Sequence, residues 1–104
     1  MKGPAMREDA ATLVLSAAQI ELARHALGLT RGRQSYRNHF CCGPGHDDFD
    51  QWEAMTAAGA ARRFKPSVLS GGDFTFVLTR SGAEAALRRG ESLDAKHFPE
   101  PSDA

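Results

Sequence analysis

Residues 73–79 carry the pattern that most limits the fold, because Phe74, Phe76 and Leu78 stand at every second position. This alternation predicts a β-strand with one apolar face. Residues 60–65 form a second candidate strand, and residues 66–72 between them are rich in Pro, Gly and Ser. Such residues are typical of turns and loops. The sequence therefore predicts a β-hairpin with a long connecting loop.

A first helix is predicted after Ser16. Ser16 and Gln19 have the spacing of a capping box, in which each side chain bonds the other residue's backbone N–H. Leu15 and Ile20 flank this start in the positions of a hydrophobic staple. Gly28 follows the apolar stripe and is expected to end the helix, because glycine readily adopts the left-handed conformation at that position.

A second helix is predicted to begin with Asp47 or Asp48 as its cap and to end at Gly59. Asp50 and Glu53 add negative charge near the start of this helix. Carboxylates are favourable there because the helix dipole is positive at its N-terminus.

A third helix is predicted over residues 80–89, directly after the hairpin. Thr79 or Ser81 is the expected cap, and Ser81 with Glu84 has the spacing of a second capping box. Gly90 is the expected terminator.

These elements predict one small α+β domain of about three helices and a β-hairpin. The core is expected to be thin, because 17 of the hydrophobic residues are alanine and the larger apolar set numbers 24. We assign residues 1–10 to a disordered N-terminus, residues 11–90 to the domain and residues 91–104 to a flexible C-terminal tail. In that tail only Leu93 and Phe98 are large and apolar.

The segments 52–63 and 76–87 resemble a winged-helix domain. In winged-helix repressors this pattern marks the end of the recognition helix, the wing hairpin and the helix that packs after it. The resemblance covers roughly residues 47–89. It implies a winged-helix-like fold and, as one function, a DNA-binding transcriptional regulator.

The segments 35–40 and 43–48 are similar to small proteins encoded by bacteriophages and prophages. This second resemblance implies no chemistry. It implies an accessory protein that works in the cytoplasm of a bacterial host and binds a host protein or complex. Inhibition of a host defence or regulatory system is one concrete form of that function.

The neutral net charge of the chain conceals segments of opposite sign. Residues 24–46 contain four arginines and no acid, whereas residues 47–53 carry four carboxylates and no base. That acidic segment lies where the resemblance places the recognition helix, and carboxylates there would repel phosphates. DNA binding is therefore the second hypothesis. Its candidate contacts are Arg31, Arg33, Arg37, Arg62 and Arg63.

The leading hypothesis is a protein partner, because oppositely charged patches beside aromatic residues can orient a docking surface. Two alternatives stay open. Tyr36 and Phe40 can instead be core residues, and the arginines can instead pair with the acidic helix start. Residues 35–40 fit either a helical turn or a strand. The candidate partner-binding residues are Arg31, Arg33, Tyr36, Arg37, His39, Phe40, Asp47 and Asp48.

His39, Cys41, Cys42 and His46 are the right donor types for zinc, but adjacent cysteines seldom both face one ion. Cys42 and His46 lack an orienting third group for nucleophilic catalysis. The Gly pair at 71–72 is not followed by the Lys of a phosphate-binding loop. We therefore predict no metal, no cofactor and no enzymatic activity.

The remaining features bear on location and assembly. A balance of 13 basic and 13 acidic residues argues against nonspecific binding to nucleic acid or an anionic membrane. No run of about 18 apolar residues could span a bilayer. The N-terminus lacks the apolar stretch of a signal peptide, so a cytoplasmic location is expected. A monomer and a homodimer are both compatible with the sequence.

Overall fold

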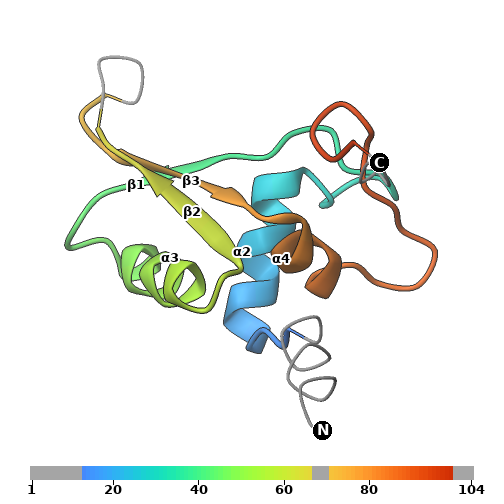
Figure 1. Ribbon diagram of the computed structural model, residues 1–104, viewed down its shortest axis with the longest axis horizontal. Coiled ribbons are helices and arrows are strands. Elements are labelled where there is room, and N and C mark those ends of the chain that lie inside the picture. The colour runs from blue at the N-terminus through green and yellow to red at the C-terminus, as the bar shows by residue number, and fades with distance from the viewer. Residues whose placement is uncertain (1–12, 67–70, 100–104) are drawn as a thin grey trace, which may run out of the picture.

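The computed structural model describes residues 13–66 and 71–99, and in this part the chain forms three helices and three strands (Figure 1). The α+β class is confirmed. The strands form an antiparallel sheet in the order β1-β3-β2, with β3 at its centre. The predicted disordered segment 1–10 lies outside the described residues. The elements are α2 (Ala17–Leu27), β1 (Phe40–Cys42), α3 (Asp47–Ala57), β2 (Ala61–Phe64), β3 (Phe74–Leu78) and α4 (Arg80–Ala85).

Both predicted ends of α2 are confirmed. The Ser16 hydroxyl accepts a hydrogen bond from the backbone N–H of Gln19 at 3.1 Å, and the Ser16 N–H donates to the Gln19 side chain at 2.9 Å. Gly28 follows the helix with φ +80°, a left-handed conformation that glycine adopts without steric cost.

The prediction that Asp47 or Asp48 caps α3 is wrong. His46 is the N-cap and makes no side-chain capping bond, so Asp47 and Asp48 are the first two residues of the helix. Their carboxylates still lie at the positive end of the helix dipole, where negative charge is favourable. The stabilisation of this helix start is therefore electrostatic.

The predicted hairpin is confirmed as β2 and β3, with Ala61 opposite Leu78 and Phe64 opposite Thr75. The third strand, β1, pairs with the other side of β3 and places Phe40 opposite Phe76. Of the two options for residues 35–40, the helical turn is wrong. The chain is irregular over residues 35–39 and becomes a strand at Phe40.

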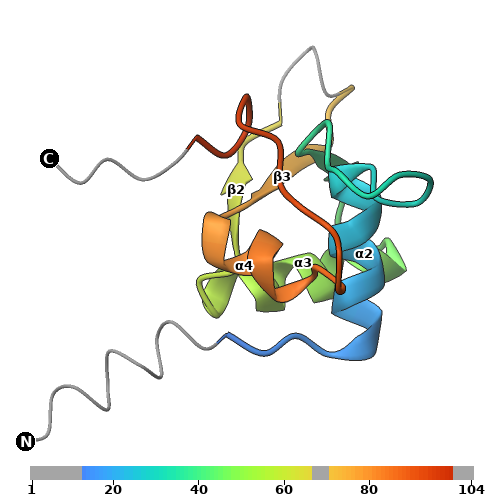
Figure 2. The ribbon, with the colours of Figure 1, turned by 90° about the vertical axis from the view of Figure 1, so that its right-hand side faces the viewer.

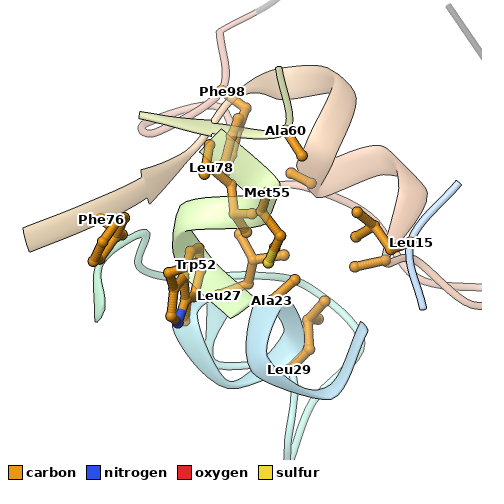
Figure 3. Packing of buried hydrophobic residues seen from close by; sticks show 14 of the residues in the cluster. Leu15, Ala23, Leu27, Leu29, Trp52, Met55, Ala60, Phe76, Leu78 and Phe98 are labelled. Carbon is orange, nitrogen blue, oxygen red and sulfur yellow. The ribbon is translucent and has the colours of Figure 1, made fainter. Parts of the chain in front are cut away.

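One face of the sheet packs against the helices and forms the core. Trp52 of α3 and Phe76 of β3 are both fully buried, and their rings stack with centroids 5.5 Å apart (Figure 3). Met55 and Leu27 fill the space between α3 and α2. A few large side chains with many alanines around them thus make up the core, as the composition predicts.

The structure corrects the prediction of a flexible tail for residues 91–99, which run back across the domain (Figure 2). Glu91 forms an ion pair at 2.5 Å with Arg24 of α2, and both side chains are about nine-tenths buried. Ser92 pairs with Gln34 in a parallel bridge. Phe98 is buried in the core with 6% of its surface exposed. The predicted tail residues 100–104 lie outside the described part.

Helix α4 is shorter than predicted and ends at Ala85 instead of Arg89. Thr79 is its cap and accepts from the Gly82 N–H at 3.1 Å, whereas Ser81 lies inside the helix and does not form the second predicted capping box. The chain leaves the helix at Ala86, whose carbonyl accepts a hydrogen bond from Arg24.

Loss of the Glu91 carboxylate is expected to destabilise the fold. Glu91→Gln leaves the buried Arg24 guanidinium without its counter-charge, which costs roughly 3 kcal/mol in comparable buried pairs. The control Glu21→Gln removes an exposed ion pair with Arg88, worth at most about 1 kcal/mol. Urea denaturation of both variants at pH 7 measures the difference. Equal stabilities would contradict a structural role for the buried pair.

The same pair gives the fold a pH dependence. Hydrogen bonds from Arg24 lower the pKa of Glu91 from 4.5 to about 2. A lowered folded-state pKa means that the stabilisation is complete above the unfolded value near 4.5 and is lost as the pH falls toward 2. Wild-type stability is therefore expected to fall between these values more steeply than that of Glu91→Gln.

Gly82→Ala tests the contact of α4 with the start of the hairpin. A Cβ at Gly82 would lie 2.0 Å from the Ala60 carbonyl oxygen, so the backbones would have to separate. We expect destabilisation of roughly 1–3 kcal/mol despite the better helix propensity of alanine. Gly32→Ala, whose Cβ would meet nothing within 4 Å, is the matched control and should be neutral or slightly stabilising in urea denaturation.

Candidate protein-binding surface

A shallow hollow of about 240 Å³ lies where α2, β1 and the segment before β1 meet. Three of the residues predicted to bind a partner, Arg37, His39 and Phe40, line it. His25 of α2 and Cys41 of β1 complete the lining. The structure therefore brings together the part of the predicted set that lies between residues 37 and 40.

The segment that carries these residues is held by the end of α2. The last carbonyls of a helix have no partner within it and need donors from elsewhere. The Leu27 carbonyl accepts from the Tyr36 N–H at 3.1 Å, and the Ala26 carbonyl accepts from the His39 N–H at 3.3 Å. The Arg37 guanidinium donates to the His25 carbonyl at 2.8 Å. The helix terminus thus fixes the course of residues 36–39.

Asn38 ties the same segment to the sheet. Its side-chain oxygen accepts from the Leu78 N–H at 2.8 Å, and its side-chain nitrogen donates to the Leu78 carbonyl at 3.1 Å. This amide satisfies the backbone of β3 as a strand partner would. Asn38 therefore extends the pairing with β3 to a position before the first residue of β1.

Tyr36 is displayed at the surface, with 62% of its area exposed. Its ring lies over Gly28 so closely that a Cβ at that position would be 2.3 Å from the Tyr36 Cε2 atom. Arg37 stacks on the ring with its guanidinium carbon 5.4 Å from the centroid. The alternative in which Tyr36 is a core residue is wrong.

Phe40 is partly buried and packs against the core. Its ring contacts Trp52 with centroids 5.2 Å apart and meets His25 edge-on at 5.7 Å. Phe40 therefore forms the floor of the hollow and connects it to the core. The i, i+4 spacing of Tyr36 and Phe40 does not place them on one helix face, because the segment is extended.

The hollow is cationic. The Nε atom of Arg37 is buried and has no hydrogen-bond partner among the described residues. None of the five lining residues carries a carboxylate. An uncompensated guanidinium beside two imidazoles makes this a place where an anionic or polar acceptor group is favoured.

The other predicted residues do not line this hollow. Arg31 and Arg33 are exposed in the turn after α2 and make no ion pair within residues 13–66 and 71–99. The alternative in which they pair with the acidic start of α3 is therefore not realised. Asp47 and Asp48 line a separate depression together with His46.

The predicted DNA contacts of the hairpin are divided between the two faces of the sheet. Arg62 and Arg63 are successive residues of β2, so their side chains point to opposite faces. Arg63 pairs with Glu53 at 2.5 Å and stacks over Phe74 at 4.9 Å. Arg62 is exposed. The two arginines therefore cannot contact one phosphate backbone from the same face.

The cysteines do not form a metal site with the neighbouring histidines. Within the described ranges, no group of three or more His, Cys, Asp or Glu side chains is placed to hold a metal ion. Cys41 is exposed and Cys42 is buried, because neighbouring residues of a strand face opposite ways. Burial raises the pKa of the Cys42 thiol to about 11, which disfavours its thiolate form near neutral pH.

Two residues outside the predicted set, His25 and Asn38, also contribute to this site. His25 is exposed on α2, and its place in the lining depends on the return of residues 36–40 along that helix. Asn38 carried a weak signal, since an amide between Arg37 and His39 in an irregular segment is suited to bonding a backbone. The partner of Asn38, Leu78, is 40 residues away.

Comparison with known proteins identified no matching family model, curated protein or solved structure. The winged-helix and phage-protein resemblances therefore stay predictions. In the described chain, none of the helices combines the length and apolar character needed to cross a bilayer.

Proposed function

We propose that this protein is a non-catalytic binding protein whose partner is another protein. The contact surface consists of Tyr36, Arg37, His39 and Phe40, which we call the Tyr36 surface. The supporting observation is the exposed ring of Tyr36, which lies on Gly28 and is stacked by Arg37 beside the hollow.

A tyrosine placed in this way is suited to binding. Tyrosine and arginine are enriched among the residues that contribute most to protein–protein affinity. The ring is restricted by Gly28 and by the two backbone bonds from residues 36–39 to α2, so little side-chain freedom is lost on contact. An exposed aromatic ring that is already ordered provides contact area at low entropic cost.

The resemblance to phage-encoded proteins favours a host protein as the partner. Inhibition of a host defence or regulatory complex follows if the Tyr36 surface covers a site that the complex itself needs. This form of the proposal requires only binding, which agrees with a site that offers aromatic and cationic contacts.

DNA binding is the second candidate function, and the exposed Arg31 and Arg33 favour it. The charges on α3 oppose it. Asp47, Asp48 and Asp50 occupy the first turn of the helix that the winged-helix resemblance would place in the major groove. Phosphate contacts supply much of the affinity for DNA, and three carboxylates at that position would weaken them.

Tyr36→Ala tests the protein-binding proposal. We expect the substitution to weaken the partner complex by about 30-fold, as for a central aromatic contact worth about 2 kcal/mol. The matched control is Phe64→Ala, which removes another exposed aromatic ring, 51% exposed on β2. Affinity capture from bacterial lysate with quantitative mass spectrometry identifies the partner, and calorimetry with that partner measures the affinities.

A protein that is captured equally by wild type, Tyr36→Ala and Phe64→Ala would contradict the Tyr36 surface. Sequence-selective binding of duplex DNA at physiological salt, lost in the double variant Arg31→Ala/Arg33→Ala, would establish the second function instead. Folding of each variant is checked by its urea midpoint.

A further inference from the structure

We propose that the hollow beside Tyr36 binds the carboxylate of an acidic side chain on the partner, with Arg37 as its anchor. This inference rests on the proposed function, because it names the chemistry that the Tyr36 surface recognises. The site is the hollow lined by His25, Arg37, His39, Phe40 and Cys41.

The first argument is the incomplete bonding of Arg37. One terminal nitrogen of its guanidinium donates to the His25 carbonyl, which fixes the plane of the group. The buried Nε lacks a partner within the described residues. A buried donor without an acceptor is unfavourable, and a carboxylate oxygen is the strongest acceptor that a protein partner can offer to it.

The second argument is the charge around the hollow. Two imidazoles and one guanidinium line it, and no carboxylate does. Arg37 lies at the C-terminal end of α2, where the helix dipole amounts to about half a negative charge. This half charge offsets only part of the full guanidinium charge. The hollow therefore keeps a net positive charge, and a single carboxylate is attracted to it.

The surroundings of the hollow favour a single carboxylate over the phosphates of a nucleic acid. Asp48 lies close enough to Cys42 to contribute to the raised pKa of its thiol, so negative charge is present just beyond β1. A single carboxylate in the hollow can avoid this region. A phosphate backbone continues on both sides of each bound group and would meet it.

The hollow also has an apolar floor, which suits the stem of an acidic side chain. Phe40 closes it from below, and its contact with Trp52 fixes that ring. Tyr36 stands at the rim through its stack with Arg37. The methylene groups of a glutamate can pack on Phe40 while its carboxylate pairs with the Arg37 guanidinium.

The test uses the full chain and two matched tetrapeptides, Ac-Ala-Glu-Leu-Ala-NH2 and Ac-Ala-Gln-Leu-Ala-NH2. Titration is followed through the Nε–Hε NMR signal of Arg37, which reports directly on the unpartnered donor. We expect the glutamate peptide to shift this signal with saturation and to bind at least about tenfold more tightly than the glutamine peptide. Inorganic phosphate, as a third ligand, is expected to bind less tightly than the glutamate peptide.

Arg37→Gln is expected to abolish the preference for the glutamate peptide, as measured by backbone amide shifts of residues 39–41. Arg89→Gln, which removes an exposed arginine outside the hollow, should keep the preference and is the charge-matched control. If Arg37→Gln does not fold, the comparison of the two peptides on wild type decides the question by itself.

Equal binding of the two peptides, an unmoved Arg37 signal or tighter binding of phosphate would each overturn the carboxylate site. The proposed function fails separately. A partner captured independently of Tyr36 would overturn the Tyr36 surface even if the glutamate peptide occupies the hollow. A Tyr36-dependent partner without glutamate preference would overturn only the inference about the carboxylate.

Discussion

The ion pair between Arg24 and Glu91 joins parts of the chain that are 67 residues apart. The guanidinium of Arg24 also donates to the Ala86 carbonyl and to the Leu29 carbonyl, so one side chain connects α2, the end of α4 and the start of the loop after α2. The cost of desolvating the Arg24 guanidinium is offset by the ion pair with Glu91 and by these two additional hydrogen bonds. Without the Glu91 carboxylate, a charged group would remain in the interior.

Segment 91–99 depends on this pair and in turn supports the loop after α2. The Ser92 N–H donates to the Arg33 carbonyl at 2.8 Å, and the Ser92 carbonyl accepts from the Ser35 N–H at 3.0 Å. The Ser35 hydroxyl donates to Asp94. Burial alone would raise the pKa of Asp94, but bonds from Ser35 and His97 lower it to about 2. These bonds hold the loop at Ser35, immediately before Tyr36. The orientation of the Tyr36 surface therefore depends on the contacts of the loop with segment 91–99.

Local chemistry determined which parts of the fold were predictable. The Ser16–Gln19 capping box, the stop at Gly28 and the alternation of residues 74–78 involve neighbours in sequence, and all three predictions are confirmed. The role of segment 91–99 was not predictable, because a lone Glu91 in a polar, proline-containing segment carries no sign of a partner in α2. The bond from Arg24 to the Ala86 carbonyl, just after the early end of α4, was equally unpredictable because the two residues are 62 positions apart.

The candidate site also has parts that could be predicted from the sequence and parts that could not. Residue type placed Arg37, His39 and Phe40 in the predicted set, and these three meet in one hollow. Residue type alone could not show that Asp47 and Asp48 lie apart from these residues and line another depression. Separation of the two groups depends on the turn at residues 43–46 between β1 and α3, and a sequence pattern does not specify the direction of such a turn.

The central claim is that the buried ion pair orders the loop that carries the Tyr36 surface. Amide hydrogen exchange measured residue by residue in wild type and Glu91→Gln tests it most directly. The account predicts that the Ser35 and Ser92 amides are protected in wild type and lose far more protection in the variant than the β3 amides do. Unprotected Ser35 and Ser92 amides in wild type, or an equal loss of protection in the loop and in β3, would contradict it.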